Sequence, residues 1–143
     1  MASLLDLANR LNKLVPEIEK SASKLAIKTA ESVVGYLVYH TPVDTSQALS
    51  NWTVSLDAPN GEFIGAHFYG SYGSTRNMSA SEAFSLAKEV LKTKKPGQTI
   101  YIENNAPYIV GLNDGSISSQ PSGFVEASVL IGRKTKSKFV LMW

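Results

Sequence analysis

Apolar residues recur at three- and four-residue steps over residues 17–39, which is the strongest pattern in the chain. This spacing predicts an α-helix of about six turns with one apolar face. Small residues on that face predict a close approach to a sheet that the helix covers. The face consists of Ile18, Ala22, Leu25, Ala26, Thr29, Ala30, Val33, Val34, Leu37 and Val38. Thr41 and Pro42 end the helix, because the residue before a proline avoids helical geometry.

A shorter amphipathic helix precedes it over residues 3–14. Ser3 is suited to its N-cap position, and one face carries Leu4, Leu7, Ala8, Leu11 and Leu14. Pro16 then lacks the backbone N–H that a helix interior uses but is tolerated in a first turn. We therefore expect a kink or a restart at Pro16.

Alternation of apolar and polar residues predicts strands in the middle of the chain. Residues 52–57 alternate clearly, and residues 99–103 are rich in β-forming residues. Asn60 and Gly61 favour a tight hairpin, with a weaker strand over residues 63–68. A single helical turn ending at Leu49 precedes the first strand, with three candidate caps, Asp44, Thr45 and Ser46.

Further helices are predicted over residues 80–94, where Ser79 and Glu82 form a capping-box pattern, and over residues 122–132. Residues 108–112 are a short helix or an extended piece. Residues 69–80 are rich in glycine, serine and tyrosine and predict a flexible surface loop.

These elements predict an α+β fold. A long N-terminal helix and two shorter helices pack on a small antiparallel β-sheet, with extended N- and C-terminal arms. We expect one domain over residues 1–143, with its core over about 15–132 and a basic, apolar arm over 133–143.

Composition narrows the class of protein. The chain has 143 residues, of which 18% are charged, a lower share than the roughly 25% usual for soluble domains. A lightly charged surface is typical of a protein that meets other proteins. With no cysteine, disulfides, a thiolate nucleophile and a cysteine zinc site are excluded. We expect folding in a reducing cytoplasm, since we find neither a secretory signal nor a membrane span.

Candidate chemistry is sparse. The two histidines, His40 and His67, belong to no nucleophile motif, and the chain has no metal-ligand motif. We therefore predict no enzyme activity and no cofactor, and keep a site at His40 and Asp44 as an enzymatic alternative. Tyr69 and Tyr72 are candidate contact residues, because tyrosine is favoured at interfaces.

The last eleven residues carry most of the excess charge. The chain's net charge is only +2, yet residues 133–143 hold four basic residues and no acidic one. The apolar residues that follow the basic run begin at Phe139 and end at Trp143. Two interpretations remain open: a disordered end, or a strand-like arm docked on a neighbouring subunit. The basic run could also meet DNA phosphates.

Three separated blocks resemble a family of tailed-phage proteins. Residues 40–52 read HTPVDTSQALSNW and resemble the family's TPVDTGRARANW. Residues 100–115 read IYIENNAPYIVGLNDG and resemble its strand followed by NNAPYI and LN. Residues 120–126 read QPSGFVE and resemble QAPAGFVE. The chain is thereby similar to head–tail joining or tail-completion proteins, which include minor tail proteins of the lambda Z type.

The resemblance implies a structural virion protein. Such proteins form a ring at the neck, of 6 or 12 copies by symmetry with phage necks, between the head connector and the tail terminator or tube proteins. DNA is only passing cargo in the channel, and no membrane is involved. The protein would reside in the virion tail or neck, and in the host cytoplasm during assembly. A small DNA-binding protein using the basic arm is the alternative.

The resemblance carries no catalytic residue. The candidate structural and interface residues come from the three blocks, from the predicted loop over residues 69–80 and from the C-terminal arm. They are Thr41, Pro42, Asp44, Trp52, Tyr69, Tyr72, Asn104, Asn105, Tyr108, Phe139 and Trp143. We expect the segment from Thr41 to Asp44 to cap and orient the strand at Trp52, and Asn104 and Asn105 to pair with backbone. Ser46 stands where the family has glycine, so a left-handed turn is not required there.

Overall fold

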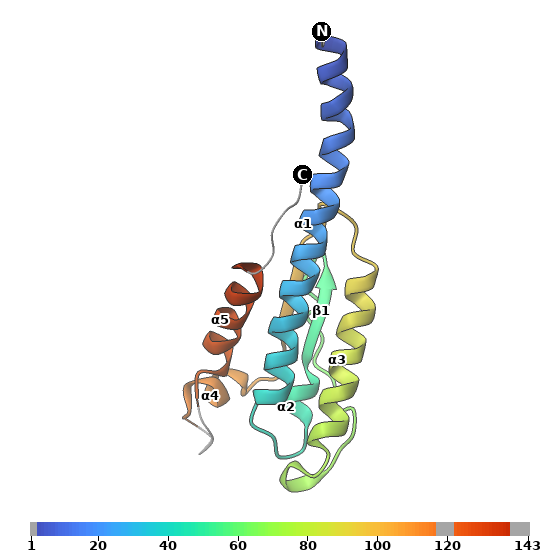
Figure 1. The fold of residues 1–143 in the computed structure, drawn as a ribbon. Coiled ribbons are helices and arrows are strands. Elements are labelled where there is room, and N and C mark those ends of the chain that lie inside the picture. The colour runs from blue at the N-terminus through green and yellow to red at the C-terminus, as the bar shows by residue number, and fades with distance from the viewer. Residues whose placement is uncertain (1–2, 117–121, 138–143) are drawn as a thin grey trace.

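A computed structural model describes residues 3–116 and 122–137. It confirms the α+β class, with helices around a small antiparallel sheet (Figure 1). The elements in chain order are α1 (Leu4–His40), α2 (Gln47–Ser50), β1 (Trp52–Leu56), the 3₁₀ turn η1 (Ser71–Gly73), α3 (Arg76–Lys92), β2 (Ile100–Asn104), α4 (Ile109–Asp114) and α5 (Phe124–Ser137).

Helix α1 runs without interruption over 37 residues, so the prediction of a kink or restart at Pro16 is wrong. Pro16 lies inside α1, where it removes only its own backbone N–H from the helical bonding. The N-terminus carries a reciprocal capping box between Ser3 and Asp6, which satisfies two backbone donors. The predicted extended N-terminal arm is therefore helical. The predicted end is confirmed, since Thr41 is the C-cap.

The sheet consists of β1 and β2 paired antiparallel, from Trp52 opposite Asn104 to Leu56 opposite Ile100. The predicted hairpin at Gly61 and the strand over residues 63–68 are wrong. Backbone groups of that segment bond to buried side chains instead of to a neighbouring strand. Asn51 binds both the N–H and the C=O of Ile64, at 2.9 Å each.

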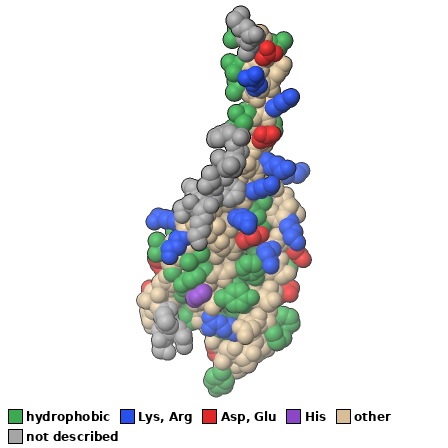
Figure 2. Space-filling view, in the orientation of Figure 1, with side chains coloured by type: hydrophobic (Ala, Val, Ile, Leu, Met, Phe, Trp, Pro, Cys, Tyr) green, Lys and Arg blue, Asp and Glu red, His purple; other side chains and the backbone are tan. Residues whose placement is uncertain are grey.

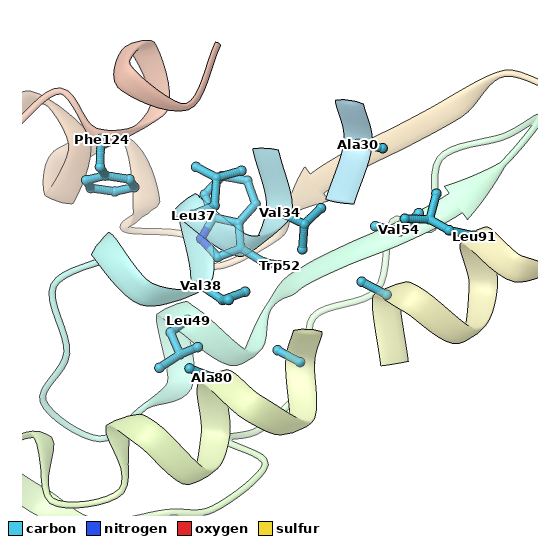
Figure 3. Close-up of a cluster of buried hydrophobic side chains, with 12 residues drawn as sticks. Ala30, Val34, Leu37, Val38, Leu49, Trp52, Val54, Ala80, Leu91 and Phe124 are labelled. Atoms are coloured by element: carbon cyan, nitrogen blue, oxygen red, sulfur yellow. The ribbon is translucent and has the colours of Figure 1, made fainter. Parts of the chain in front are cut away.

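Helix α1 supplies the centre of the core. Figure 1 shows it between α5 and α3, with the sheet behind. Val34 and Val38 are almost completely buried, beside Leu49 of α2 and Leu91 of α3. Figure 3 shows this cluster closing around Trp52 and Val54 of the sheet. Side chains from α1, α2, α3, β1 and α5 thus share one core.

Two glycines let helices approach α1 closely. A Cβ on Gly35 would lie 2.4 Å from the Phe84 ring of α3, and one on Gly132 of α5 would lie 2.8 Å from Val33. Of the small residues expected at close contacts, Ala30 is buried in the core. Ala22 and Ala26 line an open groove, which Ala30 also borders.

Helix α3 begins at Arg76, within the segment expected to be a loop, so Ser79 is not its cap. Ser79 is buried inside the helix, and its hydroxyl bonds to both the N–H and the C=O of Phe68, at 3.1 Å each. The side chain predicted to cap a helix therefore fixes the preceding loop instead.

The last helix is longer than its predicted range of residues 122–132. Helix α5 continues to Ser137, so the first part of the expected extended arm is helical. Thr135 donates a hydrogen bond to Ser32 of α1 at 2.9 Å. The remaining part of the arm, including Phe139 and Trp143, lies outside the described residues. Residues 109–114 are helical, which decides between the two forms considered for that segment.

Candidate assembly surface

Thr41 connects the end of α1 to the start of the sheet. Its buried hydroxyl donates to the Leu37 carbonyl at 2.6 Å and accepts from the Trp52 indole N–H at 2.8 Å. The indole, which has one donor and no acceptor, is therefore satisfied inside the core. Thr41 thus orients Trp52, as expected of this segment.

Asp44 holds a neighbouring turn rather than capping α2. Its side-chain Oδ1 accepts from the Tyr72 backbone N–H at 2.5 Å, and its carbonyl accepts from Gly73 N–H at 2.7 Å. These bonds fix Tyr72 in left-handed geometry at φ 59°, which an L-residue adopts only when its surroundings hold it there. The segment is thereby anchored, while its tyrosine side chains project outward.

We name residues 69–75 the tyrosine loop. Tyr69 is 74% exposed and Tyr72 is 96% exposed. The loop lies at the end of the molecule opposite the start of α1 (Figure 1). Such exposure of two anchored aromatic side chains gives a surface suited to contact with protein.

Ser46 corrects two expectations about the turn before α2. It occupies the N-cap position with φ 70°, so the turn is left-handed although glycine is absent. Among the described residues no side chain caps α2; the Ser46 hydroxyl lies 2.9 Å from the Thr75 hydroxyl instead. The strained residue is thereby tied to the tyrosine loop.

Side chains of the second sequence block hold α2. Asn104 donates to the Ala48 carbonyl at 2.7 Å and accepts from Ala106 N–H at 2.9 Å. Tyr108 donates to Gln47 at 3.0 Å, and burial raises the pKa of its hydroxyl. Asn104 therefore pairs with backbone as expected, whereas the buried Asn105 Nδ2 has no partner among the described residues.

Asn113 joins the second block to the third. Its side chain accepts from Val125 N–H at 2.9 Å and donates to the Glu126 carboxylate, while its carbonyl accepts from Gly123 N–H at 2.7 Å. Sequence reasoning missed Asn113 and Asn51, although both lie within the quoted blocks. All three blocks therefore meet in space through asparagine and tyrosine side chains.

The most exposed apolar feature is the beginning of α1, residues 4–20, which we name the stalk. It extends away from the rest of the molecule (Figures 1 and 2). Leu4 is 85% exposed and Leu11 is 50% exposed. The apolar face predicted for residues 3–14 therefore has little cover from the described part of the chain.

A groove of about 400 Å³ continues this apolar surface between α1 and β2. Ala22 and Leu25 line its α1 side, and Ile100 and Ile102 line its β2 side. Lys94 lies at its edge and donates to Ser23 at 2.9 Å. The groove lining is chiefly aliphatic and brings together no catalytic pair.

His40 and Asp44, the two residues of the alternative enzymatic site, bind different partners. His40 stacks on Tyr36, with ring centroids 3.8 Å apart, and its Nδ1 is hydrogen-bonded to the Tyr36 carbonyl. Asp44 binds the tyrosine loop instead. Among the described residues no group of three acidic or histidine side chains is placed to hold a metal ion. No helix in that part of the chain is long and apolar enough to cross a membrane.

His67 provides a pH-dependent test of the packing around β1. Burial lowers its pKa below the ordinary 6.5, although Glu82 and a backbone hydrogen bond at Ser50 act in the opposite direction. The unfolded chain therefore takes up a proton first as the pH falls, and stability decreases below about pH 6.5 until the folded pKa is passed. Denaturation curves at about pH 7.5 and about pH 5.5 give the loss of folding stability between the two pH values. This loss should be larger for wild type than for His67→Gln. Equal losses would contradict the assignment.

Comparison of the chain with protein-family models, with curated proteins and with solved structures finds no match in any of the three.

Proposed function

We propose that this protein is a structural virion component of a tailed phage, forming a ring at the neck that completes the tail end and joins it to the head connector. The observation that carries the proposal is the stalk, whose apolar side chains at Leu4, Leu7 and Leu11 are each at least half exposed. A large aliphatic side chain costs roughly 1.5–3 kcal/mol to leave in water. A protein that repeats this exposure along several helical turns is suited to packing against other subunits.

The helix itself supports an assembly role. An isolated helix of the stalk's length is marginal in water, because most helical stability in proteins comes from packing of an apolar face. The stalk continues directly from the packed part of α1, so the domain fixes its direction. Contact with neighbouring subunits would then supply the packing that the domain does not.

Contact surfaces at both ends match a position between two neighbours. The stalk lies at one end of the molecule and the tyrosine loop at the other (Figure 1). Subunits of a closed ring make head-to-tail contacts, and a neck ring also has partners above and below. We propose a ring of 6 or 12 copies between the connector and the tail terminator or tube, with DNA as cargo.

The alternative of a DNA-binding protein has weaker support. Arg133 and Lys134, the first residues of the basic run, belong to the last turns of α5. Cations there interact favourably with the helix macrodipole, so the helix accounts for part of the charge. Salt-dependent binding to duplex DNA that disappears on deletion of residues 133–143 would favour the alternative.

Tails made without this protein test the neck role. Adding purified wild-type protein is expected to let them join filled heads, measured as infectious particles. The variant Tyr69→Ala/Tyr72→Ala should fold normally, because both side chains are exposed. It should restore fewer infectious particles than wild type, by roughly tenfold or more, because exposed tyrosines at a contact surface often carry much of the binding energy.

Val110→Ala removes a similarly exposed apolar side chain elsewhere and serves as the matched control. We expect it to restore particles at the wild-type level. Tails that stay headless after addition of folded wild-type protein would refute the proposed function.

A further inference from the structure

The stalk's apolar face follows a heptad repeat. Written as positions a to g from Leu4, its a positions are Leu4, Leu11 and Ile18, and its d positions are Leu7 and Leu14. Because α1 is continuous through this region, these side chains form one stripe along it. Leu4, Leu7 and Leu11 are each at least half exposed. Leu14 and Ile18 are half-buried. A stripe with this spacing has the pattern of the a and d seam of a two-helix coiled coil.

We propose that two copies of this chain pair through their stalks in antiparallel orientation. In an antiparallel pair each a position packs against a d position of the other helix. The register that buries the largest number of these a and d side chains sets Leu11 against Leu14 of the second copy, and Leu7 against Ile18. These contacts occur twice, because the pair has a two-fold axis.

Charge selects the antiparallel orientation. In this register the g positions face each other, which sets Arg10 against Glu17 of the second copy, twice. The e positions, Ala8 and Val15, also face each other and extend the apolar seam. A parallel pair would set Arg10 against Val15 and Glu17 against Ala22, leaving both charges without an opposite partner. Flanking charges of this kind set helix orientation in coiled coils.

The remaining stalk residues agree with this seam. Pro16 falls at an f position, on the side away from the second helix, so its ring does not obstruct the contact. The beginning of the second stalk would reach Ala22, where the groove between α1 and β2 starts. The apolar surface is thus continuous from the seam into the groove.

The inference goes beyond the proposed function and does not rest on it. A cyclic ring contains head-to-tail contacts and no two-fold pair. The antiparallel dimer is therefore a form of the isolated chain, and it covers the stripe until assembly offers another partner.

Solution mass measured over a concentration series tests the pairing. The full-length wild type is expected to be dimeric, with reversible dissociation on dilution. Leu11→Asp, which places a charge in the seam, should be monomeric, while Asn12→Asp on the exposed side should remain dimeric. Leu11 is exposed in the single chain, so thermal unfolding of the domain should be unchanged. A wild type that is monomeric up to its solubility limit overturns the proposal.

Charge reversal tests the orientation. Arg10→Glu and Glu17→Arg should each weaken self-association about tenfold or more, because every reversal converts two attractive pairs into repulsive ones. An equimolar mixture of the two variants restores both attractive pairs, so heterodimers should form at wild-type strength. Lys13→Glu, a reversal on an outer position of the same helix, is the control and should dimerise normally. Reversals that leave dimerisation unchanged, or a mixture that forms no heterodimer, overturn the antiparallel pairing.

Discussion

Replacing Asn51 by alanine is expected to lower the free energy of unfolding by about 3 kcal/mol, since several buried polar groups lose their partner at once. The Asn51 side chain is completely buried. It donates to the carbonyls of Gln47 and Ile64, at 2.8 and 2.9 Å, and accepts from the Ile64 N–H. Equilibrium denaturation in urea measures the change.

Asn77→Ala is the matched control for this experiment. Asn77 lies exposed near the start of α3, so its replacement should change stability by no more than about 0.5 kcal/mol. Hydrogen exchange adds a local measurement: the Ile64 amide should lose protection in Asn51→Ala. An Asn51 variant as stable as the Asn77 variant would show that this side chain does not hold the loop.

Replacing Thr41 by valine is expected to cost about 2 kcal/mol of stability. Valine matches the shape of threonine but has no hydroxyl, so the buried Trp52 indole N–H loses its acceptor. Denaturation curves give the loss, and the change around the indole should also shift tryptophan emission.

Thr41→Ser supplies the control, because it keeps the hydroxyl and removes only a methyl group. Serine should retain the larger part of the stability, with emission close to wild type. If serine and valine destabilise equally, packing of the methyl group, rather than the bond to Trp52, stabilises this connection.

These two positions show what the sequence blocks do in the structure. Thr41, Ser46 and Asn51 of the first block are all buried and hydrogen-bonded. Asn104 and Asn113 join the three blocks to one another. The resemblance to the phage family is therefore carried by residues that build the scaffold. The proposed contact surfaces, the stalk and the tyrosine loop, lie largely outside these blocks.

The secondary structure was predictable where the local pattern and the tertiary contacts agree. The periodicity over residues 17–39 predicted the main part of α1, and Thr41 with Pro42 predicted its end. Alternation predicted β1, and β-forming residues predicted β2. In each of these elements the apolar side chains reach the core or pack against it, so the local preference and the burial favour the same conformation.

The errors occurred where a side chain distant in sequence decides the backbone. Asn60 and Gly61 favour a hairpin locally, but Asn51 takes the hydrogen bonds of Ile64, and β1 pairs with β2 instead. Ser79 has the spacing of a cap, yet its hydroxyl bonds to Phe68. No local pattern reveals these partners, because they depend on the packing of the whole chain.

The sequence by itself determined that residues 4–14 and 17–38 are helical with an apolar face, because a 3.6-residue period is a local property of the chain. That the two stretches form one continuous helix through Pro16 was decided by the structure. The tertiary structure alone decided which part of that face is covered. Val34 and Leu37 lie in the core, whereas Leu4 and Leu11, with the same spacing, remain exposed on the stalk. The physical reason is that burial requires a second surface, and the positions of α3, α5 and the sheet are fixed only by long-range contacts.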